Sequence, residues 1–544
     1  MTVPQVRDAG DSMLLVEFEP VVDRAVNARV LAVAAALRER RMPGVREVRA
    51  TLRSVAVDYD PLRVERSAVV TAVQGALAAS PRVEPGRVIE IPVAYGGEYG
   101  PDLDEVAARS GMDARAAVHA HADREYHAFM VGFMPGFTYL GPVSEAIVAP
   151  RRATPRLRVP GGSVGIAGSL TGVYPRACPG GWALIGRTHV PMFDLSKGCV
   201  VRPGDRVRFV PLDPSDRLGE FPVRPSMPGV EAEAEDPAAT VISPGLLTTV
   251  QDAGRWGHQG SGVPVGGALD APARAEANAA VGNAPDAAVL EATLSGLDLR
   301  LDRECTVAVS GADLGAELDG VPMALDEPAK AGAGARLRLT ARRSGMRAYV
   351  ALAGGLAVPV VLGSRSTELG AGFGGFEGRA LRAGDRLAVD RFTPSAALPS
   401  LPRPSVRRAL APPGGGVRLR VLVGPHEQWF TAAALEALER TRFLVTPHSN
   451  RVGYRLQGDV PLTRAAAGEM ISDATVIGGL QVPHDGQPIL LMADRQVTGG
   501  YPIMATVITA DLPVAGQLAP GDWVRFVVCA RGEALAALRE TVGT

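Results

Sequence analysis

The pattern that decides the fold occurs twice: TGVYP at 171–175 is followed by PGDRVRF at 203–209, and TGGYP at 498–502 is followed by PGDWVRF at 520–526. In both copies a Val-Pro pair and a glycine-containing turn come first, and only the spacers differ. An internal repeat indicates related structural units, and two units are too few for a solenoid. The repeat therefore predicts a pair of similar β-barrels with a site between them.

The sequence around the two copies supports a mainly β fold. From about residue 124 onward, short apolar runs alternate with many of the 63 glycines and 44 prolines, a texture typical of strands and tight turns. Helical spacing interrupts this texture near 271–282 and 431–440. The first 80 residues differ, because strand-like runs at 13–18 and 54–59 flank a helical pattern. We therefore expect an α+β, mainly β protein with a small N-terminal α+β domain.

Two proline-rich segments divide the chain, because proline removes ladder hydrogen bonds and keeps a segment extended. One of them also carries the acidic run EAEAED. We expect a small α+β domain at 1–85, a first barrel at 86–210, a linker at 211–238, a β-rich region at 239–393, a Pro/Gly-rich linker at 394–416 and a second barrel at 417–530.

Composition excludes several classes of protein. The net charge of −1 provides no field to attract nucleic acid or an anionic membrane. No run of about 18 apolar residues predicts a spanning helix. The four cysteines are scattered and form no CxxC pair, so neither a disulfide framework nor a thiolate zinc site is indicated, and no metal site is expected. With no signal peptide pattern at the start, we expect a cytoplasmic protein.

Several ordered motifs resemble one enzyme family. The first half carries FMPGFTYL at 133–140, VPGGSVGIAG at 159–168, PGGW at 179–182 and IGRT at 185–188. These resemble the first subunit of bacterial ATP-dependent 5-oxoprolinase, also labelled allophanate hydrolase subunit 1 or a sporulation kinase inhibitor. The second half carries PGLLTTVQDAGR at 244–255, GSRST at 363–367, SNRVGYRL at 449–456 and ADRQ at 493–496, which resemble the partner subunit.

The resemblance implies a cyclophilin-like barrel in each half and a fusion of two subunits into one working unit. It further implies ATP-dependent opening of 5-oxoproline to glutamate, with ATP and Mg²⁺ as cofactors. A small-molecule substrate and a separate 5-oxoprolinase catalytic subunit would be the partners, and a homo-oligomer is left open. The chain departs from the family pattern at Leu269, where Met is usual, at Asp473, where Glu is common, and at Val497, where Thr is common.

Other functions stay open. The same modules resemble the carboxyltransferase region of urea carboxylase and urea amidolyase, which implies carboxyl transfer from carboxybiotin to a urea-like acceptor. Biotin would not be attached to this chain, because Lys197 and Lys330 are its only lysines and neither follows a methionine. A literal allophanate hydrolase is less well supported, since no Ser-Ser pair lies beside a lysine. A non-enzymatic alternative is inhibition of a sensor kinase by the first half.

Phosphate or carboxylate binding would depend on arginines and loop amides. No GxxxxGK[ST] loop exists, and the planar guanidinium suits bidentate binding of these anions. The GGSVG segment at 161–165 matches GxSxG, but no helix-forming sequence follows, so we interpret it as a loop between strands whose amides face an anion. The candidate substrate- or nucleotide-binding residues are Arg156, Ser163, Gly165, Arg187, Arg255, Arg365 and Tyr501.

Four residues are candidates for catalysis. Asp494 and Arg495 follow an apolar run and precede the TGGYP turn, so we expect both side chains at a barrel mouth, where they would position a nucleophile and neutralise a phosphoryl group. A structural ion pair is the alternative. Asp252 has a similar setting, with turn formation as its alternative role. His127 is a candidate general acid–base group, or a structural histidine.

Overall fold

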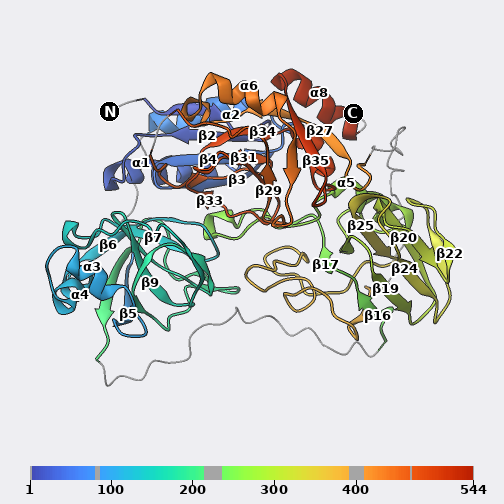
Figure 1. The fold of residues 1–544 in the computed structure, drawn as a ribbon, viewed down its shortest axis with the longest axis horizontal. Coiled ribbons are helices and arrows are strands. Elements are labelled where there is room, and N and C mark those ends of the chain that lie inside the picture. Colours follow the sequence, from blue (N-terminus) through green and yellow to red (C-terminus); the bar gives the residue numbers. More distant parts are fainter. Residues whose placement is uncertain (1–2, 80–85, 214–235, 391–409, 466–467, 543–544) are drawn as a thin grey trace.

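The computed structural model describes residues 3–79, 86–213, 236–390, 410–465 and 468–542. These form an N-terminal α+β domain, two closed barrels and a two-sheet region, with the N-terminal domain lying beside the second barrel (Figure 1). The expected α+β, mainly β fold with one barrel in each half is confirmed. Most of both expected linkers, at 214–235 and 391–409, falls outside the described residues.

The N-terminal domain is a four-stranded antiparallel sheet that is buried on both faces. Its order is β1-β2-β4-β3, with β1 at Gln5–Asp8, β2 at Met13–Glu17, β3 at Val45–Ala50 and β4 at Ser54–Tyr59. Helices α1 (Arg24–Glu39) and α2 (Arg66–Ala79) share a hydrophobic core with the sheet. Side chains from β2 and β4 that point the other way, such as Met13, Leu15 and Ala56, pack on Val476 and Ile503 of the second barrel.

The first barrel closes in the order β10-β7-β6-β15-β5-β12-β9. Its strands are β5 (Val88–Tyr95), β6 (Glu125–Val131), β7 (Thr138–Gly141), β9 (Ser163–Ala167), β10 (Leu170–Val173), β12 (Ala183–Arg187) and β15 (Arg206–Pro211). Outside the barrel lie α3 (Leu103–Ala108), α4 (Ala114–Ala122), η1 (Glu145–Ile147) and the two-stranded ribbons β8 (Arg156–Val159) with β11 (Cys178–Gly180) and β13 (Phe193–Asp194) with β14 (Gly198–Cys199).

The second barrel closes in the order β27-β34-β31-β32-β29-β28-β35. Its strands are β27 (Gly416–Val423), β28 (Phe443–Val445), β29 (Gly453–Gln457), β31 (Gly479–Gln481), β32 (Ile489–Leu491), β34 (Ile503–Val507) and β35 (Trp523–Val528). The accessory elements are η3 (Glu427–Trp429), α6 (Ala432–Arg440), η4 (Thr509–Asp511), α7 (Leu512–Ala515), α8 (Arg531–Val542) and the pair β30 (Asp473–Ala474) with β33 (Thr498–Gly499).

Numbered along the chain, the strands of both barrels follow the same cyclic order, which confirms the repeat. In each barrel the PGDxVRF segment forms the last strand, and that strand pairs in parallel with the first, β15 with β5 and β35 with β27. The TGxYP segments are not equivalent, however. TGVYP begins inside the fifth strand, β10, whereas TGGYP lies between the fifth and sixth strands, β32 and β34. The repeat therefore predicted the topology but not the position of this motif.

Residues 236–390 form two β-sheets packed around one core. The six-stranded sheet holds β22 (Val321–Pro322), β21 (Ala316–Leu318), β24 (Arg336–Leu339), β19 (Leu297–Leu301), β16 (Ala239–Pro244) and β26 (Arg386–Leu387). The five-stranded sheet holds β17 (Leu247–Gln251), β18 (Val289–Thr293), β25 (Ser344–Leu352), β20 (Cys305–Asp313) and β23 (Ala329–Ala331). Helix α5 (Ala271–Ala280) packs on β20 and β25, and η2 (Gln259–Ser261) precedes it. In the part of the chain that the structure describes, no helix is long and apolar enough to cross a membrane.

Polar contacts join the two ends of the chain. Asp11 accepts hydrogen bonds from the Thr509 backbone N–H at 2.9 Å and from its hydroxyl at 2.6 Å. Arg531 of α8 donates to the Tyr59 hydroxyl at 2.6 Å. Because the N-terminal domain packs on the last barrel, the two halves of the chain hold each other without depending on the segment that connects them.

Proteolysis within 214–235 is therefore expected to leave both halves associated. The shared apolar surface and the Asp11 and Arg531 contacts remain intact after such a cut. Size-exclusion chromatography of the cleaved protein should give one peak that contains both fragments. Two separately eluting fragments at micromolar concentration would contradict this expectation.

Candidate functional site

The two barrels meet where the β6–β7 connection of the first touches β33 of the second. The Thr498 hydroxyl accepts a hydrogen bond from the Phe133 backbone N–H at 2.8 Å. A Cβ at Gly132 would lie 2.2 Å from Thr498 Oγ1, so only glycine allows this approach. The contact brings side chains of both halves to one place.

Tyr139 of β7 contributes the most distinctive group at this junction. Its hydroxyl lies within hydrogen-bonding reach of the Thr498 and Ser472 hydroxyls, both from the second half. Burial raises the pKa of Tyr139 more than these hydroxyls and nearby Arg151 lower it. The phenol is therefore a neutral hydrogen-bond donor over the physiological pH range.

An aromatic wall lines the first-barrel side of the junction. The Phe137 ring lies 5.0 Å from Tyr139, 5.2 Å from Tyr174 and 5.3 Å from Trp182, all edge to face. Ile471 of the second half packs against the same cluster. These rings belong to a buried hydrophobic cluster that borders the polar groups of the junction.

Arg151 adds a charged group to the three hydroxyls. A Cβ built on Gly500 would lie 3.6 Å from Arg151 Nη1 and 3.7 Å from Ser472 Oγ, so both groups meet at this glycine turn. Arg151 is exposed, whereas Tyr139, Ser472 and Thr498 are buried. Three hydroxyls and one guanidinium suit a carbonyl or carboxylate oxygen. We define Tyr139, Arg151, Ser472 and Thr498 as the inter-barrel site.

The structure separates Asp494 and Arg495, which the sequence suggested as a pair at a barrel mouth. Both Asp494 oxygens accept from Arg451, at 2.8 and 3.0 Å, and Arg451 also donates to Glu291 and to the Gly267 carbonyl at 2.7 Å. Asp494 therefore belongs to a buried ionic network between the second barrel and the two-sheet region. This placement favours the structural alternative for Asp494.

Arg495 lies at the junction of three units and is 1% exposed. Its Nη2 donates to Gln259 Oε1 at 2.7 Å and to the Thr475 carbonyl at 3.3 Å, and Arg49 of the N-terminal domain donates to the same carbonyl. Burial, followed by the charge of Arg49, lowers the pKa of Arg495 to about 9. The Nη2 contacts of Arg495 join the units, whereas its Nε and Nη1 are buried without a hydrogen-bond partner among the described residues.

Asp252, Arg255 and Arg365 come together around the segment from Ser364 to Ser366. Burial alone would raise the pKa of Asp252, but hydrogen bonds from Ser364, Ser366 and two backbone N–H groups hold it below its usual value. Arg255 lies over the Phe373 ring at 5.1 Å and is 1% exposed, while the Arg365 side chain pairs with Asp390. These contacts favour a turn-forming role for Asp252.

The first-barrel candidates do not converge on one point with the inter-barrel hydroxyls. The interpretation of GGSVG as a loop is wrong for its second part, because Ser163 and Gly165 lie in β9. A strand rather than a helix follows, so the segment is not a nucleophile elbow. Arg156 pairs with Asp102 at 2.7 Å, and Arg187 donates to the Gly161 carbonyl at 2.7 Å. Their charges are directed to groups of their own barrel.

His127 and Tyr501 have different surroundings. The His127 ring contacts Asn27 Oδ1 at 2.7 Å, and burial, followed by the charge of Arg24, lowers its pKa to about 4. A neutral imidazole that donates to Asn27 fits a structural histidine at the contact with α1. Tyr501 is 39% exposed and follows the Gly499–Gly500 turn, next to the inter-barrel site.

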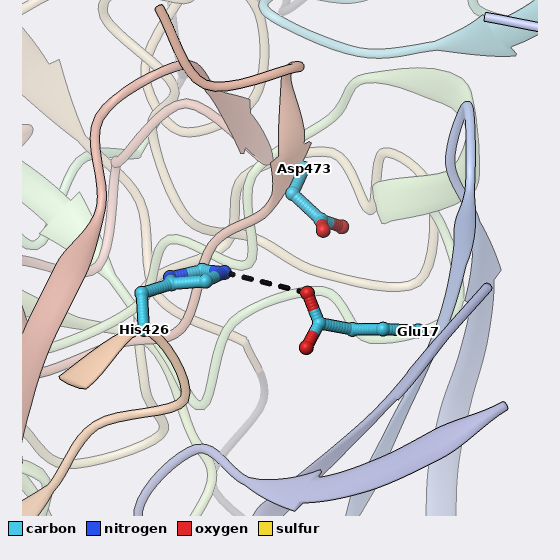
Figure 2. A group of neighbouring side chains, drawn as sticks. All are labelled: Glu17, His426 and Asp473. Atoms are coloured by element: carbon cyan, nitrogen blue, oxygen red, sulfur yellow. Dashed lines mark ion pairs between the residues drawn. The ribbon is translucent and has the colours of Figure 1, made fainter. Parts of the chain in front are cut away.

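The sequence did not identify Tyr139, Ser472 or Thr498 as site residues. Tyr139 stood inside the quoted FMPGFTYL motif and Thr498 inside the repeated TGGYP segment, but a lone hydroxyl residue carries no chemical signature of its own. Only the contact between the barrels gives them a common role. Glu17, His426 and Asp473 form a further buried group of potential metal ligands, which the sequence also did not suggest (Figure 2).

Two family models match most of the chain. Residues 261–528 match the carboxyltransferase domain, subdomain A and B, and residues 4–200 match the carboxyltransferase domain, subdomain C and D. The second half is 41% identical over 300 residues to the 5-oxoprolinase C subunit of Escherichia coli, covering 55% of this chain and 94% of that protein. The first half is 39% identical over 226 residues to the 5-oxoprolinase B subunit of Bacillus subtilis, covering 39% of this chain and 94% of that protein.

More distant and full-length comparisons agree. A urea amidolyase of Lachancea kluyveri is 34% identical over 310 residues, covering 53% of this chain but only 17% of that protein. The crystal structure of TTHA0988 superposes with a TM-score of 0.83 at 36% identity, covering 96% of this chain and 100% of that one. The resemblance found in the sequence is thus confirmed over both halves. The chain belongs to the carboxyltransferase-domain family and joins homologues of the B and C subunits of 5-oxoprolinase in one polypeptide.

Proposed function

We propose that this chain is the fused B–C component of an ATP-dependent 5-oxoprolinase, a cyclic-amide hydrolase that opens 5-oxoproline to glutamate. One observation carries the proposal: the first half, homologous to the B subunit, supplies Tyr139 and Arg151, and the second half, homologous to the C subunit, supplies Ser472 and Thr498, to a single site. Fusion of the two homologues fits a site that needs both. By analogy with the names of the relatives, a further subunit completes the enzyme.

The inter-barrel site suits the substrate better than the nucleotide. A lactam such as 5-oxoproline offers a carbonyl oxygen to the neutral Tyr139 phenol and a carboxylate to Arg151. Magnesium bound to ATP prefers carboxylate and water oxygens, whereas the side chains of this site are hydroxyls and a guanidinium. Although Arg151 suits a phosphate, the site includes no carboxylate to hold Mg²⁺, and we assign ATP with Mg²⁺ to the separate catalytic subunit.

ATP hydrolysis that depends on 5-oxoproline is expected only when this chain is combined with the separate catalytic subunit. Phosphate release should be measured for each protein alone and for the mixture, with and without 5-oxoproline, and glutamate should appear in equal amount. Full activity from this chain alone would contradict the assignment of ATP to the partner. Phosphate release by the mixture that does not depend on 5-oxoproline would contradict the proposed substrate.

Carboxyl transfer is the second candidate, because both family models are carboxyltransferase subdomains and a urea amidolyase is among the relatives. The three hydroxyls and Arg151 would also suit a urea-like acceptor. Carboxybiotin would have to come from a separate carrier protein, since neither Lys197 nor Lys330 follows a methionine. Incorporation of labelled bicarbonate into urea, with a biotin carboxylase and carrier added, would favour this function over the first.

A further inference from the structure

A buried polar cluster lies where the N-terminal domain meets the second barrel. Glu17 at the end of β2, His426 after β27 and Asp473 of β30 present ligand atoms that all lie within 4.8 Å of one another. They are 7%, 0% and 1% exposed. Figure 2 shows the His426 ring and both carboxylates directed into the same space, with His426 Nε2 3.9 Å from Glu17 Oε1.

The N-terminal domain holds both carboxylates through several contacts. Asp473 Oδ1 accepts from the Ser54 hydroxyl, from Thr51 Oγ1 at 3.2 Å and from the Ala474 backbone N–H at 2.7 Å. Arg53 Nη2 lies 2.8 Å from Glu17 Oε1 and 3.6 Å from Asp473 Oδ2. A guanidinium thus already bridges the two carboxylates and provides their counter-charge.

A metal ion does not fit this cluster. The Ile503 backbone N–H donates to His426 Nδ1 at 3.1 Å, so the neutral ring carries its proton on Nε2, the nitrogen that faces the carboxylates. A metal-bound histidine has the opposite arrangement, because its other nitrogen donates a hydrogen bond. The charge of Arg53, with Arg7 2.8 Å from Glu17, further disfavours a second cation.

The cluster instead offers a hydrogen-bond donor and an acceptor. His426 Nε2 and Asp473 Oδ2 are both buried, and neither has a hydrogen-bond partner among the described residues. Burial lowers the pKa of His426, which keeps the ring neutral with Nε2–H as a donor. The ligand atoms of Glu17, His426 and Asp473 lie within 4.8 Å of one another. One water molecule with hydrogen bonds of about 2.8 Å can bridge atoms at this separation. A water held by several polar groups is an ordinary part of a protein interior.

The chain itself connects the cluster to the inter-barrel site. Asp473 directly follows Ser472, whose hydroxyl reaches Tyr139, and β30 pairs with β33, which carries Thr498. We propose that Asp473 is a positioning residue: hydrogen bonds from Thr51 and Ser54, with the charge of Arg53, fix its carboxylate and thereby set the Ser472 hydroxyl against Tyr139. The N-terminal domain then supports the inter-barrel site, which Leu52 also adjoins in the hydrophobic cluster that contains Tyr139. For catalysis, this inference rests on the proposed function.

A double-mutant cycle tests the proposal in the complete enzyme, reconstituted with its partner subunit. Asp473→Asn is expected to lower kcat/KM for 5-oxoproline about 100-fold, as a misplacement of roughly 1 Å does. Ser472→Ala should cause a loss of the same order. If Asp473 acts through Ser472, kcat/KM of the double variant should equal that of the less active single variant. Fully additive losses would overturn the proposal.

A second readout needs no partner and no activity. In protein labelled with fluorotyrosine, the Tyr139 fluorine resonance is identified by its loss in Tyr139→Phe. Asp473→Asn should shift that resonance, while the control Asp511→Asn, which removes another buried carboxylate of the second barrel held by Arg420, should not. An unchanged Tyr139 resonance in folded Asp473→Asn would overturn the positioning role. Binding of Zn²⁺ or Mn²⁺ to the wild-type chain, if His426→Gln abolished it, would overturn the role as well. If Asp473→Asn shifts the Tyr139 resonance but the complete enzyme does not act on 5-oxoproline, the positioning role is supported and only the proposed function is refuted.

Discussion

Replacing Arg451 by methionine is expected to lower the free energy of unfolding by about 3 to 5 kcal/mol at pH 7. Arg451 is 4% exposed and donates to Asp494, to Glu291 and to the Gly267 carbonyl. Methionine fills similar space but leaves Asp494 and Glu291 buried with much of their counter-charge removed. The loss in free energy of unfolding therefore reflects buried carboxylates left without a partner, and it is much larger than the net contribution of an ion pair to stability.

Urea unfolding monitored by tryptophan fluorescence measures the Arg451→Met effect. Arg440→Met is the matched control, because Arg440 pairs with Glu436 on the exposed face of α6 and its side chain is 80% exposed. A change within about 0.5 kcal/mol is expected there. A loss below about 1 kcal/mol for Arg451→Met would show that the network contributes little.

The effect of Arg451→Met should shrink as the pH falls. Burial alone would raise the pKa of Glu291, but Arg451 and Arg347 together hold it below its usual value. A carboxyl whose pKa is depressed by folding stabilises the protein above its unfolded pKa of about 4.3, and this contribution is lost as the pH falls through the folded pKa. Without Arg451, the buried Glu291 takes up a proton as the pH falls toward 4, so the difference from wild type should be smaller than at pH 7.

The sequence predicted the barrels well, because they depend on local patterns. PGDRVRF and PGDWVRF mark the last strand of each barrel, and alternating apolar residues define that strand wherever it occurs. The TGxYP similarity was misleading as a guide to position. A Thr-Gly pair followed by Tyr-Pro suits a strand end or a turn equally well, and the two copies use both possibilities.

The site was harder to predict, because it depends on contacts between distant parts of the chain. Tyr139 meets Ser472 and Thr498 only after the first barrel packs on β33, more than 300 residues away. Asp494 and Arg495 together follow an apolar run and precede the TGGYP turn, which predicted one location for both side chains. In the structure, Asp494 contacts Arg451 and Arg495 contacts Gln259. Adjacency in sequence does not fix the partner of a buried charge when several other charges lie within reach.

Tyr139→Phe is expected to lower kcat/KM for 5-oxoproline about 100-fold in the complete enzyme, the typical cost of losing one positioned donor. The buried phenol interacts with both Ser472 and Thr498, so its loss removes a shared hydrogen-bond partner of two hydroxyls. Because burial raises the pKa of Tyr139, the wild-type pH profile should show no loss of activity from ionisation of this group up to its usual pKa of about 10.

Tyr59→Phe is the control for Tyr139→Phe, because Tyr59 is also buried but its hydroxyl bonds to Arg531, at the contact with α8. That variant should lose stability while its kcat/KM per folded molecule stays near wild type. The aromatic wall of Phe137 and Trp182 remains intact in Tyr139→Phe, so the fold should persist and the lost activity should reflect the missing hydroxyl. Wild-type kcat/KM in a folded Tyr139→Phe enzyme would remove the inter-barrel hydroxyls from the reaction and direct attention to the Asp252 and Arg255 group.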